Sequence, residues 1–185
     1  LKATKGGKEK IFAAATQTAI DYSKALDAGR VPLVLRAKHK LFTKLVYGKV
    51  QAAFGGELTW AISGGAALGE RLGHYFRGMG VNIMEGWGIT ETSAAATVNR
   101  PSMQKIGTVG VPLPGFEARL SDEGEIQVRG GHVFAGYENN PEETAKVLAE
   151  DGWFSTGDLG EIDDDGFLRI IGRAKDILVT AAGKN

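Results

Sequence analysis

The chain contains no cysteine among its 185 residues. Disulfide bonds and thiolate metal sites are therefore excluded, and a reducing, cytoplasmic compartment is the natural expectation. No apolar run approaches the roughly 20 residues that a membrane-spanning helix needs, and no secretory signal opens the sequence. With 43% hydrophobic and 24% charged residues, the composition predicts a globular protein with a buried core.

The net charge is zero, but the charges are unevenly distributed. Residues 1–50 contain 11 Lys and Arg against 3 Asp and Glu, whereas residues 51–185 contain 11 against 19. The basic part has a helical pattern, which leaves two interpretations open. One is peripheral contact with anionic lipid or ligand phosphates. The other is a solvated helix surface, which is favoured because the lysines are scattered rather than striped. No nucleic-acid partner is expected.

The first half of the chain predicts helices followed by an α/β unit. Apolar spacings of three and four indicate a helical hairpin over 8–54, with helices at 8–28 and 33–54. A strand, a glycine loop, a helix and a second strand follow within 58–91. This order is typical of a parallel sheet covered by helices. In such sheets ligands collect at the carboxyl ends of the strands. The loops at 63–65 and 86–88 both fall at such ends, so they are expected side by side on one edge if their strands are neighbours.

After residue 100 the pattern changes to short alternating runs between turn residues. The runs 116–120 and 124–129 predict small antiparallel or barrel-like β structure. A helix capped by Asn140 and a hairpin at 161–168 are also expected. The expected organisation is an α/β portion over 1–100, a β-rich subdomain over 101–172 and a hinge with the start of a further domain over 173–185. Both ends look like cuts from a longer protein.

The strongest functional signal is the stretch Glu85-Gly86-Trp87-Gly88-Ile89-Thr90-Glu91-Thr92. Two glycines bring the backbone within reach of a flat ligand, because glycine has no Cβ. Trp87 offers a stacking face, Thr90 a hydroxyl and Glu91 a carboxylate. Together they suit a nucleotide with its phosphates and a magnesium ion.

Several common ligand-binding patterns are absent from the sequence. There is no G-x-x-x-x-G-K-[ST] phosphate loop, and Glu91 stands where a dinucleotide fingerprint needs its third glycine. The acidic stretch 163–166 lacks the alternating ligands of a calcium loop and predicts a turn. His39, His74 and His132 lie far apart, which favours structural roles over metal binding.

Four segments occur in an informative order: Ser63-Gly64-Gly65-Ala66, the stretch 86–91, Gly152-Trp153-Phe154-Ser155-Thr156-Gly157-Asp158 and Gly172-Arg173-Ala174-Lys175-Asp176. In this order the sequence resembles the superfamily of AMP-forming acyl-CoA synthetases, adenylation domains and luciferases. The resemblance implies an α/β fold, part of a large N-terminal domain, in which a parallel-type sheet layer with covering helices precedes a small β-barrel-like subdomain. It also implies ATP or AMP, Mg²⁺ and coenzyme A as cofactors.

The resemblance assigns a role to each matching residue. Gly64, Gly65 and Ala66 would lie along one face of the adenine, and Trp87 would stack on the other, where the family more usually has tyrosine. Thr90 would donate to the α-phosphate, and Glu91 would hold Mg²⁺. Asp158 would accept from the ribose hydroxyls, and Arg173 would reach the ribose or a phosphate. Glu85, Gly86 and Gly88 complete the nucleotide-binding set, and Lys175 and Asp176 fall at the hinge between the family's two domains.

The segments 130–137 and 177–185 and the two long helices resemble the long-chain fatty acid–CoA ligase branch. An acyl tunnel could pass Met84, Gly86 and Ala94–Ala96, although these alanines equally fit a packed helix start. The loop that grips the outer phosphates and the C-terminal catalytic lysine have no match here, so the chain alone is expected to be inactive. Two other classes stay open, a ligase for a different carboxylic acid and a non-catalytic nucleotide-binding module. A lipid-surface interaction piece led by the basic helices is a third.

Overall fold

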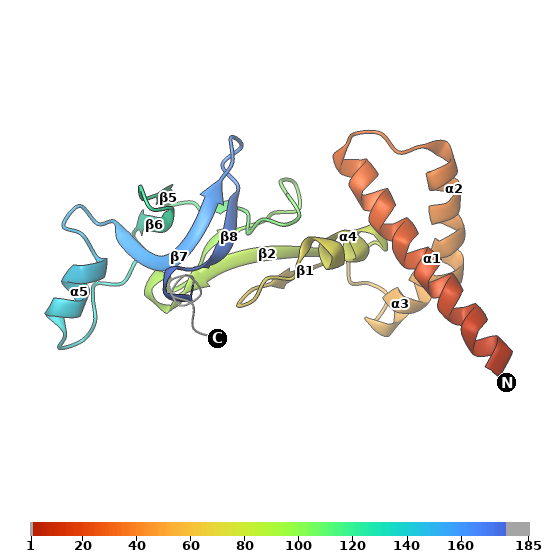
Figure 1. The fold of residues 1–185 in the computed structure, drawn as a ribbon, viewed down its shortest axis with the longest axis horizontal. Helices are drawn as coiled ribbons and strands as arrows, with labels where there is room; N and C mark the ends of the chain where they lie inside the picture. Colours follow the sequence, from red (N-terminus) through yellow and green to blue (C-terminus); the bar gives the residue numbers. More distant parts are fainter. Residues whose placement is uncertain (1, 177–185) are drawn as a thin grey trace. The chain divides into compact units, whose positions relative to one another are not determined.

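A computed structural model describes residues 2–176, with side chains from Gly6 onward (Figure 1). The chain forms two compact units. The first holds the residues up to Ser63 together with Ala67–Met84, and the second holds Gly64–Ala66 and the chain from Glu85 onward. The sequence predicts a subdomain boundary at residue 100. The two units meet at other residues, and the boundary at residue 100 stays a prediction.

The first unit is mainly helical. It contains α1 (Lys2–Asp27), α2 (Leu33–Phe42), a π-helical segment (Thr43–Tyr47), α3 (Gly48–Ala53) and α4 (Glu70–Gly78). The helix expected over 33–54 is therefore one helical stretch with a π segment inside it. Strand β1 (Trp60–Ser63) completes the strand–helix–strand order predicted for 58–85.

Small residues let α1 and α4 pack closely in this unit. A Cβ on Gly78 would lie 2.0 Å from the Ala19 carbonyl oxygen, so only glycine fits there. The core around this contact consists of Ala15, Ala19, Tyr47, Met79 and Val81. The Tyr47 phenol donates to the Ala15 carbonyl oxygen at 2.7 Å, and burial raises the pKa of Tyr47 to about 12.

A buried polar cluster also joins α1 to α4. The Ser23 hydroxyl lies 3.0 Å from His74 Nδ1, and Arg77 Nε donates to the same hydroxyl at 2.8 Å. Arg77 also forms an ion pair with Asp27 at 2.6 Å. Burial, and then the positive charge of Arg77, lower the pKa of His74 from its ordinary value. The cluster is therefore built around a neutral imidazole.

Strand β2 (Asn82–Ile89) begins in the first unit and ends in the second. Beside it in the first unit lies β1, and the Asn82 N–H donates to the Thr59 carbonyl oxygen at 2.9 Å. In the second unit, β2 pairs antiparallel with β3 (Ala94–Val98), which pairs antiparallel with β4 (Val111–Pro112). The parallel-type layer expected from the sequence does not extend to these strands.

One local prediction is wrong in this region, and one of two alternatives left open is excluded. Residues 86–88 are not a loop, because β2 continues through them to Ile89 and the turn comes at Thr90–Thr92. Ala94–Ala96 are not a helix start, because they form the beginning of β3. In both places strand pairing overrides the local preference of glycine for turns and of alanine for helices.

The β2–β3 ladder is interrupted at the glycine–tryptophan motif. Trp87 pairs with Thr97, but the next residue, Gly88, pairs with Ala95, so Ala96 has no partner on β2. Such a bulge bends and twists the strand that carries it, and bulges are frequent beside functional sites.

The second unit also contains the predicted antiparallel β structure. Its sheet has the strand order β5 (Phe116–Leu120), β6 (Glu125–Gly130), β7 (Phe154–Ile162) and β8 (Leu168–Arg173). Helix α5 (Pro141–Val147) begins after Asn140, whose side chain accepts from the Glu143 N–H as predicted. The core of this unit consists of Ala96, Phe116, Ile126, Val128, Phe154 and Leu168, with Trp87 and Ile89 of β2 packed against it.

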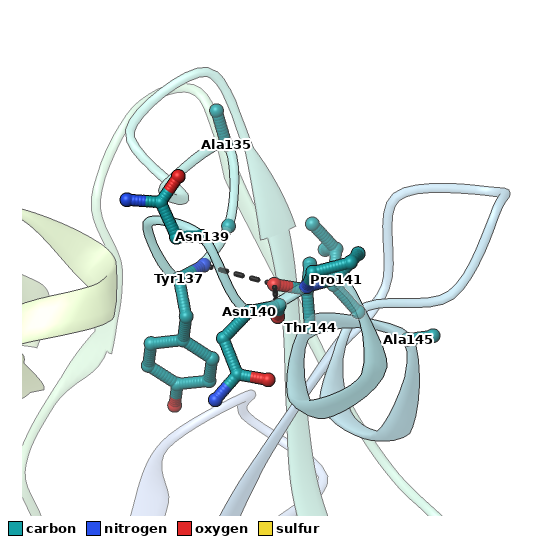
Figure 2. Close-up of a pocket in the computed structure, with 9 residues that line it drawn as sticks. Ala135, Tyr137, Asn139, Asn140, Pro141, Thr144 and Ala145 are labelled. Carbon is teal, nitrogen blue, oxygen red and sulfur yellow. Dashed lines mark hydrogen bonds between the residues drawn. The ribbon is translucent and has the colours of Figure 1, made fainter.

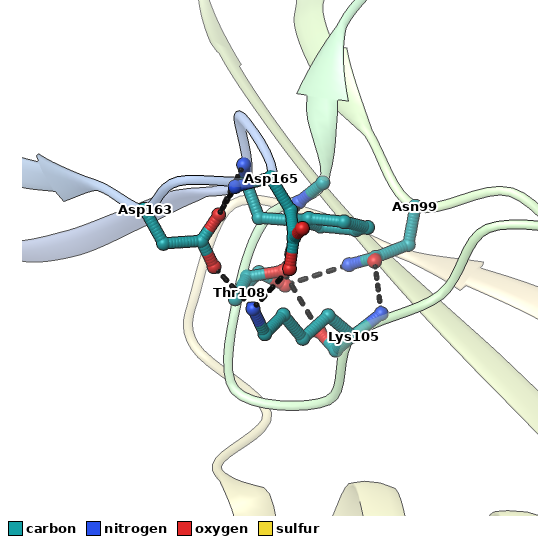
Figure 3. A network of polar contacts seen from close by, with 7 residues as sticks. Asn99, Lys105, Thr108, Asp163 and Asp165 are labelled. Carbon is teal, nitrogen blue, oxygen red and sulfur yellow. Dashed lines mark hydrogen bonds and ion pairs between the residues drawn. The ribbon is translucent and has the colours of Figure 1, made fainter. Parts of the chain in front are cut away.

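A polar network fixes the loop between β3 and β4 (Figure 3). The Asn99 amide donates to the Thr108 carbonyl oxygen at 2.7 Å and accepts from the Lys105 N–H at 2.9 Å. The Lys105 ammonium donates to Asp163 at 2.5 Å and to Asp165 at 3.2 Å, and its hydrogen bond holds the pKa of Asp163 below the ordinary value. The acidic stretch is thus a hairpin turn joined to a lysine.

No helix within residues 2–176 has both the length and the apolar composition that crossing a bilayer requires.

Candidate functional site

The first two glycine segments meet in the second unit. A Cβ on Gly64 would lie 3.6 Å from the Gly86 carbonyl oxygen, so the segment Gly64–Ala66 lies against β2, as predicted. These three residues are exposed. Gly65 has a φ of 84°, a backbone conformation that favours glycine, so the turn itself explains this residue.

The close packing of β3 against β2 requires residues without a side chain at positions 86 and 88. A Cβ on Gly86 would lie 3.0 Å from the Thr97 carbonyl oxygen, and one on Gly88 would lie 1.7 Å from the Ala94 carbonyl oxygen. The absent side chains therefore allow β3 to approach β2. The predicted approach of a flat ligand to these glycines stays a prediction, and the group that approaches them in the structure is backbone of the same chain.

Trp87, Asp158 and Arg173 form a hydrogen-bonded group. The Trp87 indole N–H donates to Asp158 Oδ2 at 2.9 Å, and Arg173 Nε donates to Asp158 Oδ1 at 3.0 Å. Asp158 lies on β7 directly opposite Arg173 on β8, and it is only 5% exposed. The structure thus joins three residues that lie up to 86 positions apart in the sequence, and each oxygen of a buried carboxylate receives one donor.

Glu91 is held by the segment that follows β6. The Tyr137 phenol donates to Glu91 Oε1 at 2.8 Å, and the Phe134 N–H donates to the Glu91 carbonyl oxygen at 2.8 Å. The Ser93 hydroxyl donates to the His132 carbonyl oxygen at 2.9 Å. The hydrogen bond to the Glu91 carboxylate raises the pKa of Tyr137 above its ordinary value. Three hydrogen bonds, two at Glu91 and one at Ser93, therefore connect residues 90–93 to residues 132–137.

Sequence reasoning missed the pairing of Tyr137 with Glu91. In the sequence, Tyr137 stands out only as part of a segment typical of one branch of the family. The two residues are 46 positions apart, and no local pattern predicts a contact at such a distance. A tyrosine close after a strand of the β-rich region was the only available signal.

The turn that carries Thr90 and Glu91 is unusually constrained. The buried Thr92 hydroxyl accepts from the Ile89 N–H at 3.0 Å and lies 2.8 Å from the Ala94 carbonyl oxygen. Ser93 and Ala94 have positive φ angles of 57° and 121°. Strained backbone persists only where its surroundings hold it, and it is concentrated at ligand-binding positions. Thr90 itself is exposed on this turn.

An open hollow of about 550 Å³ lies beside Tyr137 (Figure 2). The Thr144 hydroxyl accepts from the Tyr137 N–H at 2.9 Å and donates to the Asn140 carbonyl oxygen at 2.9 Å. This pair ties the Tyr137 backbone to the first turn of α5. The hollow is lined by Ala135, Gly136, Tyr137, Asn139, Asn140, Pro141, Thr144, Ala145 and Leu148.

The remaining predicted site residues lie in β2 (Glu85) and just after β8 (Lys175 and Asp176). The Glu85 carbonyl oxygen accepts from the Asn99 N–H at 2.9 Å, and the residue is buried. Lys175 and Asp176 are exposed just after β8, and their hinge role stays a prediction. The segment 177–185 lies outside the described residues.

Comparison with known proteins agrees with these motifs. The family model described as AMP-binding enzyme matches residues 10–138. The chain is 54% identical over 183 residues to long-chain-fatty-acid–CoA ligase FadD15 of Mycobacterium bovis, covering 99% of this chain and 30% of that protein. It is 36% identical over 159 residues to long-chain-fatty-acid–CoA ligase 5 of Rattus norvegicus, covering 80% of this chain and 23% of that protein.

Solved structures of related ligases share the fold. The ATP-bound RpMatB-BxBclM chimera B3 superposes with a TM-score of 0.63 at 34% identity, over 74% of this chain and 30% of that one. The anthranilate CoA ligase AuaEII in complex with anthranoyl-AMP superposes with a TM-score of 0.60 at 28% identity, over 65% of this chain and 25% of that one. The chain spans about 30% of the length of the FadD15 relative. Because the family model covers more than half of its residues, the chain belongs to the AMP-binding enzyme family.

Proposed function

We propose that this chain is the adenylate-binding part of the large domain of a long-chain fatty acid–CoA ligase. The whole enzyme would join a fatty acid to ATP, giving acyl-AMP and pyrophosphate, and would then pass the acyl group to coenzyme A. The observation that carries the proposal is the buried Asp158 carboxylate held between Trp87 and Arg173. The fatty acid substrate is supported by the names of relatives such as FadD15.

The proposed binding roles follow from the residues that the structure brings together. Asp158 would accept from the ribose hydroxyls, because a buried carboxylate forms strong charge-assisted hydrogen bonds. Trp87 would offer its ring face to the adenine, and the exposed Gly64–Ala66 segment would lie along the other face. Arg173 would reach the ribose or a phosphate with the part of its guanidinium that does not contact Asp158.

The Thr90–Thr92 turn would bind the α-phosphate and the metal. Thr90 would donate its hydroxyl to a phosphate oxygen, and its constrained turn would keep that donor in place. Within the described residues no group of three His, Asp or Glu side chains could hold a metal ion. The single carboxylate of Glu91 fits Mg²⁺, which commonly takes one or two carboxylates together with phosphate oxygens and water. When bound, Mg²⁺ neutralises charge on the phosphates.

The proposal is tested by fatty-acid-dependent pyrophosphate release by the full-length protein that contains this chain. Fatty acids of increasing chain length are compared with aryl and amino acids. We expect release with long-chain fatty acids, and Glu91→Gln should lower the rate about 100-fold, as removal of an electrostatic partner of the transition state does. Glu150→Gln, at an exposed position, is the matched control and should leave the rate unchanged.

The same measurement separates the alternatives. Release only with aryl or amino acids would replace the fatty acid by another carboxylic acid. AMP binding without acid-dependent release, unaffected by Glu91→Gln, would indicate a non-catalytic nucleotide-binding module. Thermal unfolding of each variant establishes that the substitution spares the fold.

We also propose a reducing, cytoplasmic compartment. For the basic segment 1–50 the solvated helix surface stays the favoured interpretation, and peripheral contact with anionic lipid is the alternative to be tested. The excess of Lys and Arg in this segment supports attraction to anionic lipid. Co-sedimentation with vesicles that contain phosphatidylserine should then decline as salt is raised, because salt screens exposed charges. Binding that is absent or insensitive to salt would refute electrostatic attachment.

A further inference from the structure

The hydrogen bond between Trp87 and Asp158 gives the tryptophan a second task besides stacking. Its indole N–H donates to Asp158 Oδ2 at 2.9 Å, while Arg173 Nε donates to Asp158 Oδ1 at 3.0 Å. The Asp158 side chain is 7% exposed and the Arg173 side chain 63% exposed. Two donors of the protein therefore hold the Asp158 carboxylate, the Trp87 indole N–H on one oxygen and the guanidinium of the exposed Arg173 on the other.

The acceptor capacity of the carboxylate matches what a ribose requires. An ionised carboxylate has about four acceptor positions, two on each oxygen. Trp87 takes one position on Oδ2, and Arg173 takes one on Oδ1. By this count, Trp87 and Arg173 leave one acceptor position untaken on each oxygen, which is the number that a pair of neighbouring hydroxyl groups needs.

The two tasks of Trp87 are geometrically compatible. An indole N–H lies in the plane of the ring, so donation to Asp158 uses the edge of the side chain. The ring faces are not used by this hydrogen bond. An indole N–H is also a donor only, so in this hydrogen bond the Asp158 oxygen must be the acceptor.

We infer that Trp87 is a positioning residue for the ribose, because its indole N–H turns Asp158 so that each carboxylate oxygen faces one hydroxyl of the ribose 2′,3′-diol. The inference rests on the proposed function, in which Asp158 binds the ribose. It adds that the preference for a nucleotide with both hydroxyls depends on the N–H of Trp87 as well as on Asp158.

The test compares AMP with 2′,3′-dideoxy-AMP in calorimetric titrations of the full-length protein. AMP is used because it contains the ribose and lacks the outer phosphates. Trp87→Phe keeps a stacking face and removes the N–H. We expect it to weaken AMP binding about tenfold, the scale of one hydrogen bond to a charged group, and to leave dideoxy-AMP binding within about twofold of the unsubstituted protein.

Two further proteins make the comparison specific. Trp60→Phe removes an exposed indole from β1 and should change neither titration. Replacing Trp87 by its benzothiophene analogue, in which sulfur takes the place of the N–H, keeps the ring shape and should reproduce the effect of Trp87→Phe. This analogue keeps the test decisive if Trp87→Phe does not fold.

The outcomes separate this inference from the proposed function. A preference for AMP over dideoxy-AMP that shrinks when the N–H is removed supports it. An equal loss for both nucleotides means that Trp87 acts only by stacking, and it overturns the inference while AMP binding stands. Equal binding of both nucleotides by the unsubstituted protein also overturns it. No AMP binding at all contradicts the proposed function itself.

Discussion

At the scale of single residues, Gly88 should tolerate substitution poorly for a reason that involves no ligand. The Cβ of Gly88→Ala would collide with the Ala94 carbonyl oxygen, which belongs to backbone and cannot rotate away. We expect the free energy of unfolding to fall by about 3 kcal/mol, the upper end for overpacking. Denaturant unfolding of the purified chain without nucleotide measures this loss.

Gly131→Ala is the matched control, because a Cβ at Gly131 meets nothing within 4 Å. It should change the unfolding free energy by at most about 0.5 kcal/mol, as is usual at the surface. If the two variants were equally stable, the close approach of β2 and β3 at Gly88 would be refuted.

Tyr137 should influence magnesium through Glu91. Tyr137→Phe removes the phenol that donates to the Glu91 carboxylate at 2.8 Å. Groups that orient a metal ligand typically change metal affinity by 10- to 100-fold, so we expect the Mg²⁺ concentration for half-maximal pyrophosphate release to rise about tenfold. The measurement is a magnesium titration of the full-length protein at saturating ATP.

Tyr22→Phe in α1 is the control for loss of a phenol oxygen and should leave the magnesium titration unchanged. A Tyr137→Phe protein with a lower maximal rate at an unchanged magnesium requirement would contradict the proposed role. It would indicate that Tyr137 serves the turn rather than the metal ligand.

The residues of the candidate site were predictable in part. Trp87, Glu91 and Asp158 could be selected because aromatic, carboxylate and glycine residues stand in recognisable segments. Their hydrogen-bond partners could not be selected, since Trp87 and Asp158 lie in different sheets and Glu91 and Tyr137 lie outside the strands, 71 and 46 positions apart. A single sequence contains no signal for such pairs.

At the scale of elements, the contact between α1 and α4 should depend on pH through His74. Burial and the Arg77 charge lower the pKa of His74, whereas the Asp27 charge raises it. Lys24 and Glu70 have smaller effects on this pKa, which Lys24 lowers and Glu70 raises. The unfolded chain binds a proton near the ordinary histidine pKa of about 6.5, and the folded chain binds it only at lower pH. Stability is therefore fully present above about pH 6.5 and is lost as pH falls from there toward the folded pKa.

Unfolding free energies measured between about pH 8 and 5 check this expectation. His74→Asn should flatten the decline on the acidic side, because the substituted side chain no longer takes up a proton. His132→Asn, at an exposed position, serves as the control and should leave the decline in place. A decline that is the same with and without His74 would remove this cluster as its cause.

Elements with a clear period were predicted well. The alternating runs of β5 and β6 and the capped start of α5 appear where the sequence indicates them. The segment 86–96 was misjudged because its glycines and alanines favour turns and helices locally. Pairing between β2 and β3 decides their conformation instead, and that interaction is not local.

At the scale of the whole molecule, we expect the isolated 185-residue chain to form no acyl-CoA. Its proposed site covers adenine, ribose, α-phosphate and metal, while no residue of this sequence matches the family's loop for the outer phosphates or its C-terminal lysine. Acyl-CoA formation from fatty acid, ATP and coenzyme A is measured for the isolated chain beside the full-length protein. Product from the isolated chain would refute the expectation.

The bulge at Ala96 breaks the alternation of side chains along β3. Ala96 and the next residue, Thr97, are both buried, whereas successive side chains of a regular strand point to opposite faces. Deletion of Ala96 would leave Thr97 opposite Trp87 and would keep its hydroxyl on the side where it donates to the Val109 carbonyl oxygen at 2.9 Å. Loss of a paired residue would instead exchange the faces of everything beyond it. This hairpin can therefore be shortened by one residue at the bulge more readily than at its paired positions.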